Sequence, residues 1–120
     1  MIKQLKNFFR KVFKESPSNT STYRPLNWVV LKIENDETVF YKVLGIFQND
    51  AWRVNSGIVK VEEDAEHYYF YGYSKSLYVC KKNLYGVNAS LFPLSSILTK
   101  PEIKLLPKST NFMTLCTIKK

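Results

Sequence analysis

The chain has 120 residues and a mass of 14.0 kDa, so it has room for one domain with a single modest core. A hydrophobic content of 45% is typical of a globular protein and excludes a disordered chain. The formal net charge is +8, and the sequence lacks a run of about 18 apolar residues that would cross a membrane as a helix.

The charge is unevenly distributed along the chain. Residues 1–26 hold six basic and one acidic side chain, residues 27–74 hold four and eight, and residues 75–120 hold eight and one. The basic ends either form a surface for an anionic partner or lie against the acidic middle and neutralise it, and both interpretations remain open.

Residues 1–15 predict a basic amphipathic helix. Its apolar stripe recurs at steps of three and four residues, at Ile2, Leu5, Phe9 and Val12. The opposite side is basic and supplies candidate contacts, namely Lys3, Lys6, Arg10 and Lys14. Packing on its own domain is the favoured role, and docking on a partner or on an anionic membrane surface is the alternative. Pro17 ends the helix, and residues 16–25 read as a polar linker.

The remainder, residues 26–120, predicts a single β-rich domain. Apolar runs between polar turns predict strands at 28–33, 38–47, 52–61, 67–73, 77–81 and 112–118, with one helical turn at 94–98. The second of these runs is apolar on both faces, which predicts a central strand. The expected fold is mainly β with one or two helices. It is a small antiparallel, strongly bent sheet or barrel of SH3 or OB size that carries the N-terminal helix.

The third run, 52–61, alternates in one phase before Ser56-Gly57 and in the other phase after it. A one-residue phase change at a glycine predicts a β-bulge, which small barrels use to turn a corner. At the start of this run we expect Trp52 in the core and Arg53 facing solvent, with a cation–π contact as the alternative.

The most unusual segment is residues 67–73, which hold five aromatic rings and the only histidine. In a strand, Tyr69, Tyr71 and Tyr73 share one face with His67, while Tyr68 and Phe70 point the other way. One face can therefore fill a core while the other presents phenol rings. Gly72 interrupts the run where a bulge or a close backbone approach is expected.

No catalytic or metal motif accompanies these rings. His67 and Cys80 fall on neighbouring strands, but nothing around them resembles a cysteine hydrolase, so we expect no enzymatic activity. The acidic run 62–66 lacks the spacing and glycine of a calcium loop and reads as a solvated turn. Cys80 and Cys116 lack a C-x-x-C partner and are expected to be buried thiols, with a disulfide in an oxidising compartment as the alternative. The sequence thus predicts no cofactor and no metal.

The sequence instead predicts a non-enzymatic binding protein for an anionic macromolecule, most simply nucleic acid without sequence specificity. Exposed rings would stack on bases while lysines contact phosphates. The chain has 15 lysines and three arginines, which favours loose phosphate contact over base reading. The candidate contact residues are Tyr69, Tyr71, Tyr73, Lys75, Tyr78, Lys81, Lys82 and Tyr85.

The stretch from Trp52-Arg53-Val54 through the aromatic strand to Leu84-Tyr85-Gly86 resembles part of short uncharacterised proteins of tailed phages and related mobile elements. The resemblance covers residues 52–86. It implies a protein that binds a host macromolecule in the host cytoplasm. The alternative function is therefore binding of a host protein, which the aromatic face or the N-terminal helix would inhibit or redirect. A cytoplasmic location is also expected because the N-terminus lacks the features of a secretory signal.

Overall fold

The computed structural model describes residues 21–87, 94–115 and 118–119. Within these ranges the chain is mainly β, as predicted. The described strands are β1 (Thr22–Tyr23), β2 (Asn27–Glu34), β3 (Thr38–Ile46), β4 (Trp52–Val54), β5 (Ile58–Glu63), β6 (His67–Gly72), β7 (Leu77–Lys81), β8 (Ile103–Leu105) and β9 (Ile118–Lys119). The described helical segments are η1 (Gln48–Asp50), η2 (Lys82–Leu84), α2 (Leu94–Ile97) and η3 (Phe112–Thr114).

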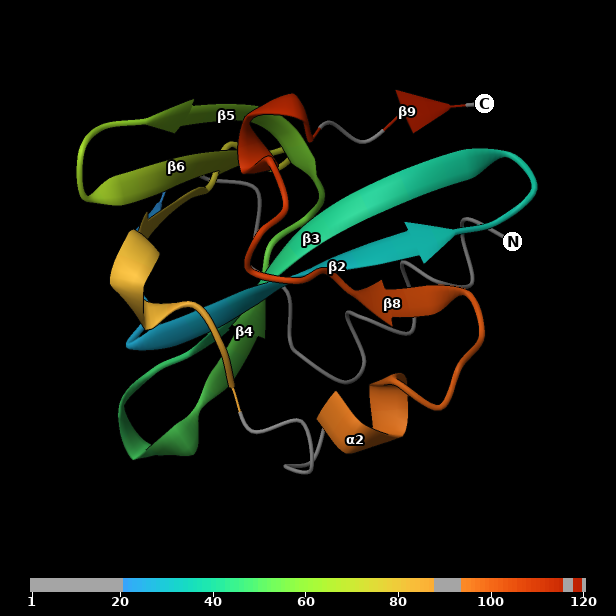
Figure 1. Cartoon of the computed structure of the whole chain (residues 1–120), viewed down its shortest axis with the longest axis horizontal. Helices are drawn as coiled ribbons and strands as arrows, with labels where there is room; N and C mark the ends of the chain where they lie inside the picture. Colours follow the sequence, from blue (N-terminus) through green and yellow to red (C-terminus); the bar gives the residue numbers. More distant parts are fainter. Residues whose placement is uncertain (1–20, 88–93, 116–117, 120) are drawn as a thin grey trace.

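The strands form two sheets rather than the single bent sheet or barrel that we expected. One sheet has the order β1-β7-β6-β5, and the other has the order β4-β3-β2-β8, with β9 added beside β3. Figure 1 shows the β5–β6 hairpin on one side of the β2–β3 pair and α2 on the other. All pairings are antiparallel except the short β1–β7 pair, which is parallel.

The long β2–β3 hairpin is the centre of the second sheet. Its register runs without interruption from Asn27 opposite Ile46 to Glu34 opposite Val39. Strand β3 lies between β2 and β4, which confirms the predicted central strand. At the hairpin turn, the Asn35 side chain accepts hydrogen bonds from the amides of Glu37 and Thr38, at 2.9 and 2.8 Å.

The predicted third strand is divided between the two sheets. Strand β4 pairs with β3 and β5 pairs with β6, so the chain changes sheet at residues 55–57. Two features of this segment make the change: Gly57 has a φ of 130°, and buried Asn55 exchanges hydrogen bonds with the backbone of Val43. The phase change was located correctly in the sequence, but it marks a crossover between sheets. A register shift between Ile58 and Lys60, of the kind that the predicted β-bulge produces, follows directly after it.

The two faces of β2 serve two different apolar clusters because side chains alternate along a strand. Val29, Leu31 and Ile33 face α2, whose Leu94 and Ile97 are fully buried against them. Trp28 and Val30 face the other sheet, where the cluster also holds Val43, Ile58, Val61, Phe70, Tyr78, Cys80, Phe112 and Leu115. The apolar positions on both sides of the central strands are thus accounted for.

Aromatic rings surround Trp28 in the space between the sheets. Its ring centroid lies 4.7 Å from that of Tyr85, 5.4 Å from Phe70 and 5.5 Å from Phe112. Its indole Nε1 donates to the Lys81 carbonyl at 2.7 Å, which satisfies the one polar group of a fully buried side chain. The ring therefore links β2 to the end of β7 and to η3.

The elements predicted in the N-terminal and C-terminal parts of the chain are confirmed only in part. The predicted linker 16–25 contains β1, which pairs with β7 and belongs to the sheet. The helical turn at 94–98 is confirmed as α2. The predicted strand 112–118 begins instead as the 3-10 helix η3, because Asn111 caps it by accepting from the Met113 amide. The predicted helix 1–15 lies outside the described residues.

Gly72 makes the close backbone approach that the sequence predicted. A Cβ atom at this position would lie 2.8 Å from the Ser56 Oγ and 3.2 Å from the Ser76 Oγ. The Ser56 hydroxyl accepts from the Ser74 amide at 2.8 Å, so moving it breaks a bond that ties the β6–β7 turn to the crossover segment. The glycine thus allows the crossover and the turn to touch.

We expect Gly72→Ala to lower the free energy of unfolding by roughly 1–3 kcal/mol, the cost of leaving a part-buried donor without its acceptor. Urea denaturation of the variant measures this loss. The matched comparison is Gly72→Ala in a Ser56→Ala background, where the clash is gone and the glycine substitution should cost less. Equal costs in the two backgrounds would contradict the assigned contact.

No helix among the described residues is long and apolar enough to cross a membrane.

Candidate binding surface on the β5–β6–β7 sheet

The surface that carries the predicted tyrosines is the side of the β5–β6–β7 sheet facing away from the core. We call it the tyrosine face. Cross-strand pairing places Tyr69 between Glu62 and Val79, and Tyr71 between Lys60 and Leu77. His67 pairs with Lys81 at the far end of the same face. The face is thus defined by Lys60, Glu62, His67, Tyr69, Tyr71, Leu77, Val79 and Lys81, of which Val79 is buried.

Carboxylates hold both central tyrosines. The Tyr69 hydroxyl donates to Asp64 Oδ2 at 2.5 Å, and the Tyr71 hydroxyl donates to Glu62 Oε1 at 2.8 Å. These bonds raise the pKa of each phenol above its usual value, since an ionised phenol could not donate to a carboxylate. The rings are half-buried and have fixed positions, although they lie on an outer sheet surface.

Asp64 organises the turn between β5 and β6. Its Oδ1 accepts from the backbone amides of Glu66 and His67 at 2.9 and 2.8 Å, and the His67 Nδ1 lies 3.4 Å from the same oxygen. The hydrogen bond from Tyr69, followed by the backbone bonds, lowers the pKa of this carboxyl well below its ordinary 3.8. The acidic run is therefore more than the solvated turn that we expected.

The same carboxylates predict how stability depends on pH. The Tyr71 hydroxyl and then Lys60 lower the pKa of Glu62 below 4.5, as the bond from Tyr69 does for Asp64. A depressed folded-state pKa means that the unfolded chain binds protons more readily, so this stabilisation is present above the ordinary pKa and is lost as pH falls. We expect the urea midpoint to fall on acidification below about pH 4.5.

The control for this prediction is Tyr69→Phe/Tyr71→Phe, which keeps the rings and removes both donors. Its urea midpoint should depend less steeply on pH below 4.5 than that of the unmodified protein, because both carboxyl pKa values return toward normal. Parallel profiles for the two proteins would show that these bonds do not set the acid response.

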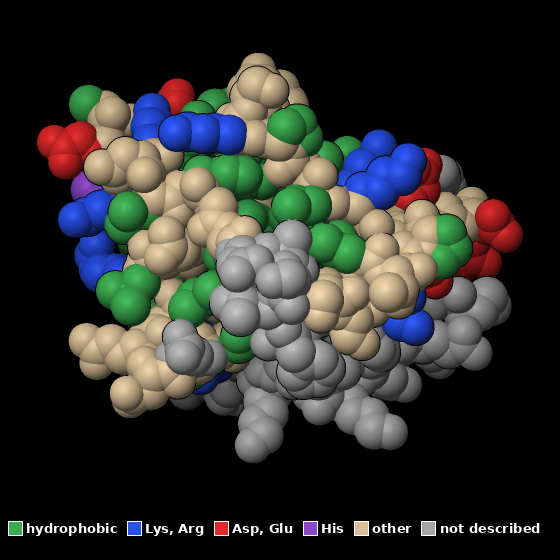
Figure 2. Space-filling model, turned by 60° about the horizontal axis from the view of Figure 1, so that its bottom comes forward, with side chains coloured by type: hydrophobic (Ala, Val, Ile, Leu, Met, Phe, Trp, Pro, Cys, Tyr) green, Lys and Arg blue, Asp and Glu red, His purple; other side chains and the backbone are tan. Residues whose placement is uncertain are grey.

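Ion pairs balance the charge around the face. Lys60 Nζ lies 3.3 Å from Glu62, and Lys82 Nζ lies 3.2 Å from Glu63 while also covering the Tyr68 ring at 4.9 Å. Figure 2 shows acidic side chains, basic side chains and the imidazole side by side at the left edge of the molecule, where the β5–β6 turn lies. The rings are thus bordered by both signs of charge rather than by a basic groove.

The structure brings only part of the predicted contact set together. Tyr69, Tyr71 and Lys81 lie on the tyrosine face, and Lys82 lies behind it beside Tyr68. Tyr73, with 54% of its surface exposed, and Lys75 lie on the turn after β6. The predicted helix contacts Lys3, Lys6, Arg10 and Lys14 lie outside the described residues.

Of two further predicted contact tyrosines, Tyr78 is corrected to a core residue, and Tyr85 is half-buried against the core. Tyr78 opposes Phe70, shares its inward face and has no exposed surface, so it cannot meet a partner. Tyr85 is half-buried beside Trp28, and its hydroxyl donates to the Leu106 carbonyl and accepts from the Val30 amide. Burial raises the pKa of this phenol. Both rings stabilise the fold.

The structure gives a physical reason to exclude a cysteine–histidine dyad. His67 lies on the outer face of β6, whereas Cys80 opposes Tyr68 on the inner face and is fully buried. Burial raises the pKa of the Cys80 thiol, which favours the unreactive protonated form. Cys80 is a buried free thiol, as predicted, and Cys116 lies outside the described residues.

The structure confirms the expected position of Trp52 but not that of Arg53, which we expected to face solvent. Trp52 packs against the cluster that faces α2, as expected for a core residue. The Arg53 guanidinium lies 4.6 Å from the centre of the Tyr23 ring, so the cation–π alternative describes it better than a solvent-facing side chain. This contact ties β4 of one sheet to β1 of the other.

Two cavities border the acidic turn of the tyrosine face. One, of about 470 Å³, runs along the edge of β5 and is lined by Glu62, Glu63, Tyr69, Tyr71 and Met113. The other, of about 280 Å³, is lined by Ala65, Glu66, Lys81, Lys82 and Asn83. The first combines carboxylates with aromatic rings and a thioether, and the second combines charged side chains with Ala65 and Asn83.

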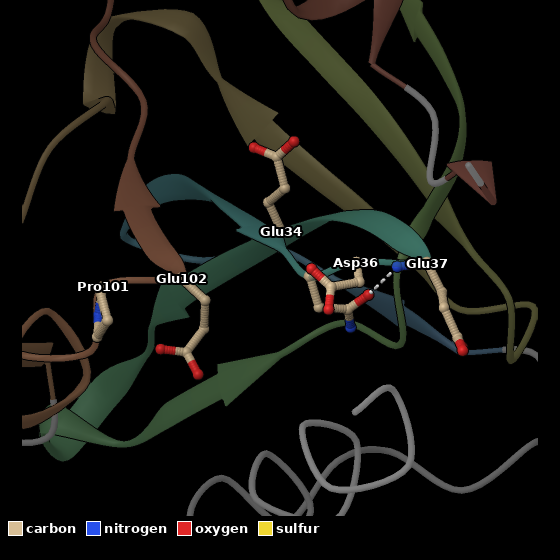
Figure 3. Close-up of a pocket in the computed structure, with 6 residues that line it drawn as sticks. Glu34, Asp36, Glu37, Pro101 and Glu102 are labelled. Carbon is tan, nitrogen blue, oxygen red and sulfur yellow. Dashed lines mark hydrogen bonds between the residues drawn. The ribbon is translucent and has the colours of Figure 1, made fainter.

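A third cavity lies at the opposite end of the molecule, at the β2–β3 turn. It has a volume of about 460 Å³ and four acidic lining residues, Glu34, Asp36, Glu37 and Glu102. Figure 3 shows their carboxylates diverging from one another instead of converging on one point. Across the described part of the chain, no group of three or more acidic, histidine or cysteine side chains has a geometry that could hold a metal ion.

The residues that sequence reasoning missed are the acceptors of the tyrosine hydroxyls, Glu62 and Asp64. A signal for both was present: an aspartate three residues before the aromatic strand is typical of an Asx turn, and a tight turn there places Glu62 across from Tyr69. Met113 had no such signal, because its place beside β5 depends on how η3 packs.

Comparison with known proteins adds no further constraint. The chain matches no protein-family model, no curated protein and no solved structure.

Proposed function

We propose that this protein is a non-enzymatic binding module that contacts another protein through the tyrosine face. The observation that supports this proposal most directly is the pair of Tyr69 and Tyr71 rings. Hydrogen bonds to carboxylates hold both rings on an outer surface of the sheet. Tyrosine is enriched among the residues that dominate protein interfaces, because it offers a large amphipathic surface at a low entropic cost. Fixing the rings in advance reduces that cost further.

The charge around the rings supports a protein partner over a polyanion. Lys60 and Lys82 are each engaged by a carboxylate, and Asp64 lies directly beside Tyr69. A phosphate backbone approaching Tyr69 would meet these carboxylates, whereas a protein surface can present both signs of charge. A host protein is the partner that the sequence prediction of a phage or mobile-element protein, made from residues 52–86, would imply.

The test is a pull-down from an extract of the source cell. It compares the proteins retained by the immobilised full chain with those retained by Tyr69→Ser/Tyr71→Ser. The control is Tyr73→Ser, which removes an exposed tyrosine from the adjacent turn. We expect one protein to be retained by the unmodified chain and by the control and lost by the double variant, with nuclease treatment having no effect. Retention by a folded double variant would contradict the proposal.

Nucleic-acid binding is the second candidate, and the net charge of +8 is the observation that favours it. Its signature is salt dependence, because phosphate binding releases counterions and weakens steeply as salt rises. Titration of single-stranded DNA and RNA at two salt concentrations separates the candidates. Tight, salt-sensitive binding that Lys81→Gln weakens would make nucleic-acid binding the better-supported function. Absence of binding at low salt would exclude nucleic-acid binding.

A further inference from the structure

We propose that the outer edge of β5, at Val61 and Glu63, accepts an extended, basic segment of the partner protein as an added strand. This inference rests on the proposed function, since it places the partner beside the tyrosine face, and it adds the conformation and charge of the segment that binds. Four observations carry it: an edge strand with outward-facing backbone groups, a groove along that edge, apolar walls on both sides, and an excess of carboxylates.

Strand β5 is the last strand of its sheet in the described part of the chain. The Asp64 amide donates to the His67 carbonyl, and the Tyr73 amide donates to the Gly57 carbonyl, which fixes the phase of the β5–β6 ladder. Backbone hydrogen bonding alternates along an antiparallel pair. The backbone N–H and C=O groups of Lys60 and Glu62 therefore point toward β6, while those of Val61 and Glu63 point outward from the sheet edge. Such an edge is a template for strand addition.

The groove beside this edge has walls suited to an extended chain. The Tyr69 and Tyr71 rings form one side, and Met113, with 39% of its surface exposed, lies on the other. Alternate side chains of an added strand point to opposite sides, so one set would contact the rings and the next set the methionine. The flexible thioether adapts to several side-chain shapes.

The charge of the edge defines the occupant. The groove is lined by Glu62 and Glu63, with Asp64 and Glu66 on the turn at its end. Lys60 and Lys82 neutralise part of this charge through ion pairs with Glu62 and Glu63, and a cationic side chain of the added segment would join the same carboxylates. An extended segment with lysine or arginine at alternate positions fits this edge, and an acidic segment or a phosphate backbone does not.

The direct test uses a short fluorescent peptide in which lysine alternates with valine and threonine. We expect it to bind the full-length protein and to bind roughly tenfold more weakly when its backbone amides are N-methylated, since about two edge hydrogen bonds are lost. A peptide with glutamate in place of lysine should not bind. Equal binding of the methylated and unmethylated peptides would overturn strand addition, and equal binding of the acidic peptide would overturn the charge assignment.

A variant pair separates this inference from the proposed function. Glu63→Pro removes an outward N–H from the edge, and Glu63→Gln, the matched control, removes only the charge. If the inference holds, Glu63→Pro loses the partner protein much more than Glu63→Gln does. A partner kept by Glu63→Pro but lost by Tyr69→Ser/Tyr71→Ser would overturn the edge inference alone. A partner kept by all three folded variants would overturn the proposed function as well.

Discussion

Trp28→Ala is expected to lower the free energy of unfolding by about 3–5 kcal/mol, the range for removing a large buried aromatic ring. Trp28 has no exposed surface, and it contacts rings from β6, from η3 and from the segment after η2. Its removal leaves a cavity that these rings cannot fill without leaving their own packing. Because small domains are stable by only about 5–15 kcal/mol, the variant should unfold at a much lower urea concentration.

The matched control is the other tryptophan. Trp52 is only partly buried, at the border of the cluster that faces α2, so Trp52→Ala should cost clearly less than Trp28→Ala. Trp28→Phe separates packing from hydrogen bonding, because it keeps a ring but removes the donor to the Lys81 carbonyl. Equal losses for the two alanine variants would contradict a central role for Trp28.

Phe112→Ala is the second large expected effect, with a loss of about 3–5 kcal/mol. Only 2% of Phe112 is exposed, and its ring lies 5.3 Å from Tyr68, 5.4 Å from Tyr85 and 5.5 Å from Trp28. Met113 occupies the next position of the same 3-10 helix and is exposed, so Met113→Ala should change stability by less than about 0.5 kcal/mol. Urea denaturation of both variants measures the difference.

The two effects should not add, because the rings touch. In a double-mutant cycle, Trp28→Ala and Phe112→Ala should show a coupling energy of about 0.5–3 kcal/mol, as expected for residues in direct contact. Additive losses would mean that η3 packs independently of the β2 ring. The prediction thus tests whether the segment around residue 112 belongs to the main core.

The same packing links stability to the candidate binding surface. Tyr68 and Phe70 anchor β6 from its inner side, while Tyr69 and Tyr71 alternate with them on the outer side. The inner rings fix the position of the strand, and the strand positions the outer rings. Variants of Trp28 or Phe112 should therefore disturb the tyrosine face only when the domain itself loosens, which gives binding experiments a stability control.

Local pattern alone located several of the strands. Strand β7 occupies the predicted residues 77–81, and the central strand predicted at 38–47 differs from β3 by one residue. Alternation and turn residues carry this information because both act between neighbours in the chain. The phase change at residues 56–57 was visible for the same reason.

Tertiary structure alone decided which faces are covered. Alternation put Tyr69 and Tyr71 on one side of β6, but the register with β7 placed Tyr78 opposite Phe70 and turned it into the core. Tyr85 and Phe112 are fixed by contact with Trp28, more than 50 residues earlier in the chain. The two-residue alternation of side chains along a strand defines which residues share a face. The segment that packs on that face comes from a distant part of the chain, which no local sequence pattern encodes.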